Sequence, residues 1–248
     1  MNMKRINGPF ILFFLILMLG FLVPSLFKAA SGERKSFSGD TYSPVHGPEL
    51  SLYDSLALDS MGLSKEAFSE ALTGYLYLKK AGNLLNQGIL SIIDFSLPSY
   101  RKRLFILDLE NRKLLFNTLV AHGRNSGKLV PTRFSNRNRS LESSLGFYLT
   151  GETYQGQNGY SLHLLGMEQG INSNALSRGI VVHAASYVND QIAERYGKLG
   201  RSEGCPAIPK GIHRAVIEKI KSGSCLFIYA KDKKYTTRSN ILLEAPIL

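Results

Sequence analysis

The sequence predicts a mostly β domain, either a barrel or a sandwich with a few short helices, preceded by an N-terminal helical extension. Two observations support this fold class. From residue 90 onward, short runs rich in β-branched and aromatic residues follow one another with turn residues between them, which is typical of short strands. Only two clear helical patterns accompany them, one at 64–81 and one at about 211–221.

An apolar run near the N-terminus predicts an export signal. Residues 10–23 (FILFFLILMLGFLV) follow Lys4 and Arg5 and precede a stretch of small residues, which is the pattern of a signal peptide. We therefore expect 1–31 to be either a cleaved signal peptide or a retained anchor that associates with the inner membrane. In both cases the protein is expected to be exported to the periplasm or cell envelope.

Composition divides the rest of the chain into four segments. Residues 32–49 contain Ser, Gly and Pro without periodicity and predict a flexible linker. A helical extension is expected over 50–84, a catalytic domain over 85–232 and a C-terminal tail over 233–248. The extension holds one helix that should pack on the catalytic domain, because apolar residues recur at helical spacing. These residues are Phe68, Ala71, Leu72, Tyr75 and Leu78, with Gly82 as the stop.

Seven runs between residues 90 and 230 are rich in strand-forming residues. They are LSIIDFS, RLFILDL, KLLFNTLVAH, LGFYLTG, YSLHLLG, GIVVHA and CLFIYA. The turn ENR between the second and third runs predicts a hairpin. Short strands of this kind, accompanied by small helices, suit a barrel and a sandwich equally well.

The net charge of +11 favours approach to polyanionic envelope material and disfavours self-association, so we expect a monomer. Nucleic acid is not an expected partner, because no recognisable module and no interleaved basic and aromatic pattern is present. The basic loop TRFSNRNR, residues 132–139, fits a solvated surface or a substrate contact. No Cys or His pair has the spacing of metal ligands, so neither a metal nor another cofactor is expected.

The stretch GRSEGCPA, residues 200–207, places one of the two cysteines between a glycine and a proline. Gly204 lets the backbone pass close to another group, Pro206 fixes the next φ, and Ser202 offers a hydroxyl. Cys205 is therefore expected on an exposed turn that presents a thiol. Such a thiol becomes a nucleophile once a base converts it to the thiolate.

A base for the thiol must come from one of five histidines. His183 ends the run GIVVH, which predicts a short buried strand that holds the ring rigidly near the sheet edge. His213 opens the periodic segment HRAVIEKIK and is better explained as the start of a helix. The order of His183 before Cys205 favours a catalytic pair over two unrelated structural residues.

The second cysteine, Cys225, lies in the run SCLFIYA and is expected to be a buried, reduced thiol. The rival interpretation is a disulfide with Cys205, which an exported chain would permit. That bond would consume the proposed nucleophile, so the two interpretations exclude each other.

The segment SRGIVVHAASYV, followed by GKLGRSEGCPAIP, resembles the catalytic core of the YkuD-type murein L,D-transpeptidases. Their signature is a histidine on a strand and, downstream, a Ser-x-Gly-Cys turn. The resemblance continues upstream through AHGRNSG and downstream to SGSCLFIYA, over about 85–230. It implies a YkuD-like β fold with Cys205 as nucleophile and His183 as its base. The turn of Ser202 and Gly204 would form the oxyanion site, with the backbone N–H groups of Cys205 and Gly204 as donors.

The sequence departs from the common pattern of this superfamily at several positions. Many members carry a second histidine before the Gly-Cys pair and an arginine two residues after the cysteine, where this chain has Glu203 and Ala207. Without that arginine, Arg201 is the nearest candidate for holding a substrate carboxylate, and Tyr187 is a further substrate-binding candidate. Either Ser186 or a backbone carbonyl could orient the catalytic imidazole.

The resemblance implies attack of the cysteine on the L,D peptide bond of a peptidoglycan stem tetrapeptide, with release of D-alanine and formation of a thioester. Transfer to an amine of another stem would give a 3-3 cross-link, whereas transfer to water would make the enzyme an L,D-carboxypeptidase. A non-catalytic peptidoglycan-binding module is the alternative from another class. Sortases expect a Thr-Leu-x-Thr-Cys strand and papain-like peptidases require Cys before His, and this sequence has neither pattern.

Overall fold

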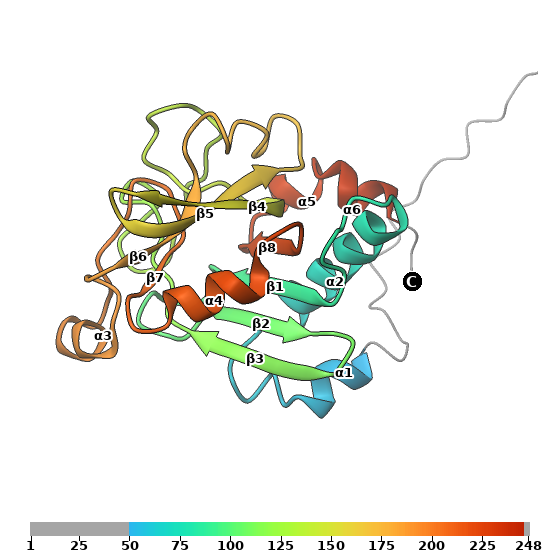
Figure 1. The fold of residues 1–248 in the computed structure, drawn as a ribbon, viewed down its shortest axis with the longest axis horizontal. Coiled ribbons are helices and arrows are strands. Elements are labelled where there is room, and N and C mark those ends of the chain that lie inside the picture. Colours follow the sequence, from blue (N-terminus) through green and yellow to red (C-terminus); the bar gives the residue numbers. More distant parts are fainter. Residues whose placement is uncertain (1–49, 246–248) are drawn as a thin grey trace, which may run out of the picture. The chain divides into compact units, whose positions relative to one another are not determined.

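The computed structural model describes residues 50–245, so the expected signal or anchor at 1–31 and the linker at 32–49 lie outside the described residues. The described residues form eight strands. They are β1 (Ile89–Asp94), β2 (Leu104–Asp108), β3 (Lys113–Thr118), β4 (Gly146–Gly156), β5 (Gly159–Gly166), β6 (Val181–Ala185), β7 (Ala207–Pro209) and β8 (Cys225–Tyr229). All eight belong to one sheet in the order β3-β2-β1-β8-β4-β5-β6-β7, which Figure 1 shows curving around the middle of the domain.

The two ends of this sheet nearly meet. After β3 the chain continues in an extended conformation, where Ala121 bridges antiparallel to Ala207 of β7 and Gly123 bridges parallel to Ser202. The chain that follows one edge strand is therefore held against the opposite edge strand. The predicted mostly β class is confirmed, and the architecture is a nearly closed barrel.

Two neighbouring pairs in the sheet are parallel. β1 lies parallel to β8, with Leu90 opposite Cys225, and β6 lies parallel to β7, with His183 opposite Ala207. The other pairs are antiparallel, including the predicted hairpin of β2 and β3. Because a tight turn cannot join parallel strands, each parallel pair depends on a long crossover. The crossover between β6 and β7 carries the turn 202–205 that contains Cys205, which we call the cysteine turn.

Six helices accompany the sheet in the described residues. They are α1 (Leu50–Ser55), α2 (Lys65–Lys80), α3 (Asp190–Tyr196), α4 (His213–Ile220), α5 (Lys233–Thr236) and α6 (Asn240–Glu244). The last two lie in the segment expected to be a C-terminal tail, where Tyr235 and Ile241 are buried. Within residues 50–245, none of the helices has the length and apolar character needed to cross a membrane.

The helix expected at 64–81 is α2. Ser64 caps its N-terminus by accepting a hydrogen bond from the backbone N–H of Ala67 at 3.1 Å, as N-cap serines do. Gly82 follows its C-terminus with a φ of +72°. The five apolar residues named from the sequence are all buried, and α2 packs against β1, β8 and α6 (Figure 1).

A small apolar cluster supports the end of the barrel where β6 and β7 lie. It is separate from the main core, and α3 contributes to it through Ala193. Its buried members are Leu119, Ala121, Ala185, Val188, Ala193, Leu199 and Ala207. Because close-packed side chains resist displacement, this cluster fixes the segments on both sides of the cysteine turn.

Candidate active site

Cys205 lies in the turn that precedes β7 and is half-buried, whereas the sequence predicted a thiol on an exposed turn. Its sulfur is 3.5 Å from the carbonyl oxygen of Gly179, to which the thiol donates. Burial raises the pKa of the Cys205 thiol, while the backbone N–H of Val181 and the positive charge of Arg178 act in the opposite direction. The resting cysteine is therefore a neutral thiol with two groups placed to stabilise its thiolate.

Ser202 shapes the turn. Its Oγ donates to the carbonyl oxygen of Cys205 at 2.6 Å and accepts from the backbone N–H of Gly204 at 3.1 Å. The Gly204 N–H is thus occupied, which corrects the expectation that it helps to bind an oxyanion. The N–H of Cys205 has no hydrogen-bond acceptor among residues 50–245, so it is the donor that this turn can offer to a developing oxyanion.

His183 lies in the middle of β6 and is buried, not at the sheet edge as expected. Its backbone N–H donates to the carbonyl of Pro206 at 3.4 Å, which places it beside the cysteine turn. The ring Nδ1 lies 3.0 Å from the carbonyl oxygen of Ala184, an acceptor, so Nδ1 carries the proton and Nε2 is free to accept one. A backbone carbonyl therefore orients the imidazole, and burial lowers the pKa of His183.

One cleft, with a volume of about 670 Å³, contains both residues. The other side-chain candidates from the sequence, Ser202, Arg201 and Tyr187, also line it. Within the described structure the thiol donates to Gly179 and not to His183. The thiol must therefore give up its hydrogen bond to Gly179 before the imidazole can take the proton.

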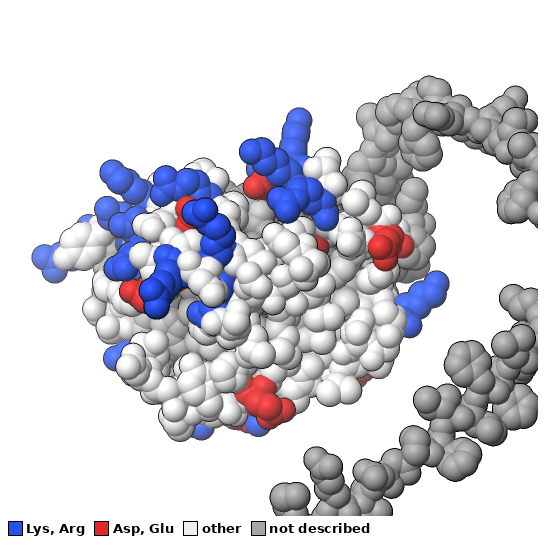
Figure 2. Space-filling view, turned by 90° about the horizontal axis from the view of Figure 1, so that it is seen from above, with Lys and Arg blue, Asp and Glu red and all other residues white. Residues whose placement is uncertain are grey.

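Positive charge dominates the cleft. Arg124, Arg139, Arg178 and Arg201 line it, together with a single acidic residue, Glu203. Glu203 forms a partly exposed ion pair with Arg124, with 3.3 Å between Oε1 and Nη2. Figure 2 shows Lys and Arg gathered toward the left of the visible face, the side on which α3 lies in Figure 1. A cleft of this character favours an anionic substrate.

Arg178 was not anticipated from the sequence, and it fixes one wall of the cleft. Its guanidinium donates to the carbonyl of Ser135 and to that of Glu142, both at 2.7 Å. Further bonds reach the hydroxyls of Ser144 and Ser140. The loop 135–144 is thereby held against the cysteine turn, and the same guanidinium provides the positive charge near Cys205.

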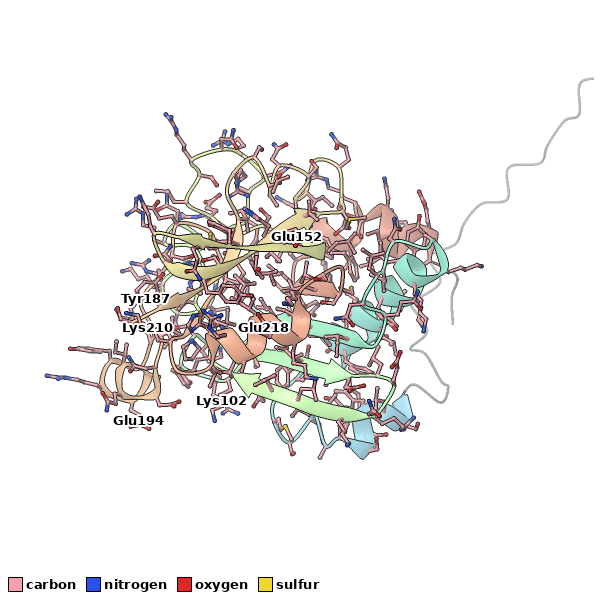
Figure 3. All side chains as sticks on the ribbon, viewed as in Figure 1. Lys102, Glu152, Tyr187, Glu194, Lys210 and Glu218 are labelled. Carbon is pink, nitrogen blue, oxygen red and sulfur yellow. The ribbon has the colours of Figure 1, made fainter. Side chains whose placement is uncertain are left out.

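Arg201 and Tyr187 have structural contacts in addition to their place in the cleft. Arg201 Nη1 donates to the carbonyls of Arg124 and Gly127 at 2.8 and 3.1 Å. Tyr187, labelled in Figure 3 on the segment between β6 and α3, packs so closely on Gly200 that a Cβ there would lie 2.6 Å from the Tyr187 Cβ. Burial raises the pKa of Tyr187 to about 12, so its hydroxyl is protonated and can donate.

The two cysteines are both free thiols, which excludes the disulfide interpretation for this structure. Cys225 is fully buried in β8, as expected, and burial raises its pKa far above the ordinary value. A thiol that stays protonated is a poor nucleophile. Cys205 is therefore the cysteine available for chemistry.

The fold and the cleft together define a class of protein: a nearly closed β barrel in which one basic cleft contains a cysteine and a histidine. Residues 59–229 match the family model of the L,D-transpeptidase catalytic domain, and the chain belongs to this family. The resemblance inferred from the sequence is thereby confirmed. A search of curated proteins gave no match.

Solved structures with a similar fold include other L,D-transpeptidases. One, from Mycobacterium smegmatis, has 10% identity and a TM-score of 0.35, with 58% of this chain and 59% of that chain covered. The helical cell shape determining protein Pgp2 from Campylobacter jejuni has 12% identity and a TM-score of 0.40, with 64% and 56% covered. An L,D-transpeptidase from Stackebrandtia nassauensis has 12% identity and a TM-score of 0.36, with 78% and 99% covered. The chain thus spans less than two thirds of the length of the first two structures.

Proposed function

We propose that this protein is an exported cysteine L,D-transpeptidase that cleaves a peptidoglycan stem tetrapeptide and transfers the acyl group to an amine, forming a 3-3 cross-link. The observation that carries the proposal is the single cleft in which Cys205, His183 and four arginines lie together. Family membership supports the reaction class.

The neutral state of both groups sets the order of events. Burial favours the thiol of Cys205 and the uncharged imidazole of His183, so the proton moves to Nε2 as the sulfur attacks the carbonyl carbon. The oxyanion that forms is stabilised by the Cys205 N–H. His183 then gives the proton to the nitrogen of the departing D-alanine, the C–N bond breaks, and a thioester remains.

The second half of the reaction reverses these roles. An amine of another stem attacks the thioester carbonyl, and His183 takes a proton from that amine. The C–S bond then breaks, and the thiolate of Cys205 leaves and takes the proton from His183. If water attacks instead, the same intermediate gives a shortened stem and the enzyme acts as an L,D-carboxypeptidase. The chemistry at the cysteine is identical in both cases.

The arginines support the substrate class. A stem peptide carries several carboxylates, and arginine binds a carboxylate through two parallel hydrogen bonds. The apolar run at 10–23 supports the proposed export to the envelope, where this substrate lies.

Mass analysis of products tests this function. Purified protein is incubated with a disaccharide-tetrapeptide. A dimer lacking one alanine means transpeptidation, and a tripeptide means carboxypeptidation. The Cys205→Ala variant should give neither product while retaining its far-ultraviolet circular dichroism. If wild-type protein binds peptidoglycan but leaves the tetrapeptide unchanged under several conditions, the protein is a non-catalytic wall-binding module and the proposal fails.

A further inference from the structure

A second cavity, which we call the basic pocket, adjoins the catalytic cleft and has no role in the chemistry described above. It has a volume of about 400 Å³ and is lined by Arg124, Lys128, Lys198, Leu199, Gly200 and Arg201. Arg124 and Arg201 also line the cleft. The two cavities are therefore neighbours with a common wall made of two arginines.

The charge in this pocket is not balanced by the chain itself. Four of the six lining residues are cationic and none is acidic. Within residues 50–245 the only ion pair made by any of the four joins Arg124 to Glu203, whose carboxylate faces the cleft side. Like charges gathered in one cavity repel one another, so an anion that enters the pocket relieves this repulsion.

The backbone around the pocket is fixed. The N–H of Leu199 donates to the buried hydroxyl of Ser99 at 3.1 Å, and the N–H of Gly200 donates to the carbonyl of Tyr187 at 3.2 Å. Leu199 itself is buried in the small apolar cluster. Lys198 is therefore carried by a segment that does not need to reorganise when a ligand arrives, which favours binding.

The pocket wall that carries Lys128 is hydrogen-bonded to the wall that carries Lys198. Arg201 Nη1 donates to the carbonyls of Arg124 and Gly127, and His122 Nε2 lies 3.2 Å from the same Gly127 carbonyl. The segment that carries Lys128 is thus tied to the segment that carries Lys198. Since both donor bonds use Nη1, the Nε and Nη2 groups of Arg201 remain for a ligand.

We propose that the basic pocket is a second substrate subsite, which binds a carboxylate of the stem peptide whose scissile bond lies at Cys205. The shared arginine wall lets one extended peptide reach both cavities, and arginine side chains suit a planar carboxylate. Lys128 and Lys198 are then specificity-determining residues. The identity of the peptide rests on the proposed function, whereas the presence of an anion subsite does not.

Equilibrium binding tests the subsite without turnover. In a Cys205→Ala background, calorimetry measures the affinity for a stem tetrapeptide and for the same peptide with its carboxylates amidated. Adding Lys128→Ala and Lys198→Ala should weaken the acid form about tenfold, because charge-assisted hydrogen bonds are lost. The matched control is the pair Lys102→Ala and Lys210→Ala, two exposed lysines outside both cavities, which should leave the affinity unchanged.

Three results would overturn the subsite. The first is an equal loss of affinity on amidation with and without the two lysines, which would place the carboxylates elsewhere. The second is an unchanged affinity for the acid form after the two lysine substitutions. The third is lysine-dependent binding of a glycerol phosphate oligomer without binding of the tetrapeptide, which would assign the pocket to a phosphate polymer. If the tetrapeptide binds in a lysine-dependent manner but wild-type protein does not turn it over, the subsite is supported and only the proposed function fails.

Discussion

Gly204 lies in the cysteine turn, where its backbone is close to the loop 135–144. Its φ is +125°, a conformation that side chains rarely adopt. A Cβ at this position would lie 2.8 Å from the carbonyl oxygen of Glu142 and 3.3 Å from Ile180 Cδ1. Its own carbonyl accepts a hydrogen bond from Ser143 at 3.0 Å. Cys205 is the next residue in the chain. Its position therefore depends on the absence of a side chain at Gly204.

Replacing Gly204 by alanine should displace the turn. We expect Gly204→Ala to abolish turnover and to lower the free energy of unfolding by about 1–3 kcal/mol, the usual range for a strained backbone position. Urea denaturation and the product assay measure the two effects. Gly211→Ala is the control, because a Cβ at Gly211 meets nothing within 4 Å. Equal stability and activity of the two variants would contradict the close packing described here.

His183 should control the pH at which the thiol reacts. Burial lowers the pKa of His183. Its imidazole therefore stays neutral, and can act as a base, at pH values below the ordinary histidine pKa of about 6.5. Alkylation of Cys205 by iodoacetamide should rise with pH through that region in wild-type protein. In His183→Gln the thiol must ionise unaided, and because its own pKa is raised, the rise should move above the ordinary cysteine value of about 8.5. Coincident profiles would remove His183 as the base.

Among the elements, α2 is the one packed most tightly against the barrel. Gly74 faces the sheet, and a Cβ there would lie 2.0 Å from Cζ of Phe147 on β4. Phe147 in turn stacks on Phe227 of β8, with 4.2 Å between ring centroids. The absence of a side chain at one helical position thus lets the helix approach the two central strands.

This contact reverses the usual effect of a glycine substitution in a helix. Glycine to alanine within a helix normally stabilises by about 0.5–1 kcal/mol, but Gly74→Ala must push α2 away from Phe147. We expect a loss of about 1–3 kcal/mol in the free energy of unfolding, as overpacking produces. Chemical denaturation measures it, with the exposed Lys80→Ala on the same helix as the control. A stabilised Gly74→Ala protein would show that α2 does not dock in this way.

The local elements could largely be predicted from the sequence. All seven apolar runs lie on strands, the ENR turn joins a hairpin, and His213 begins α4. The strand that was missed, β7, has three residues and ends in Pro209, so it has no pattern to detect. It exists because Ala207 pairs with both His183 and Ala121, which are distant in sequence.

On the scale of the whole molecule, the sheet order and most of the basic cleft could not be predicted. Cys205 and His183 were predicted as site residues because each lies in a distinctive local motif, and the structure places both in one cleft. Arg124 and Arg178 have no such motif, and they reach the cleft only because the barrel brings their loops to the same end. The parallel pairs leave no local signal either, since their partners are separated by long crossovers.

At the scale of the whole molecule, the contribution of the Glu70 carboxyl to stability should fall as pH rises above the acid range. Glu70 of α2 has a carboxyl oxygen without a hydrogen-bond partner within residues 50–245, and burial together with the charges of Glu66 and Glu168 raises its pKa to about 8. An unfolded glutamate ionises near 4.3. Between these values Glu70 holds a proton in the folded state that it loses on unfolding, so its own contribution to the free energy of unfolding falls with increasing pH in this window.

Glu70→Gln should remove part of that pH dependence. The variant should be similar to wild type near pH 4, gain relative stability up to about pH 8 and level off above it, because the neutral side chain has no proton to lose. Urea denaturation at several pH values measures the trend. Glu194→Gln, on the exposed face of α3, is the control. Parallel curves for Glu70→Gln and wild type would show that Glu70 is ionised in the folded protein.

The position of β8 in the sheet has a consequence for how the chain folds. β8 separates β1 from β4, so the first three strands and the β4–β5 hairpin each present an unpaired edge until Cys225–Tyr229 is added. Such non-local closure is slow, and open edges in the meantime are sites of aggregation. A nascent chain contains Cys205 and His183 before this strand emerges. The barrel that brings the two residues into one cleft is complete only when its last strand arrives.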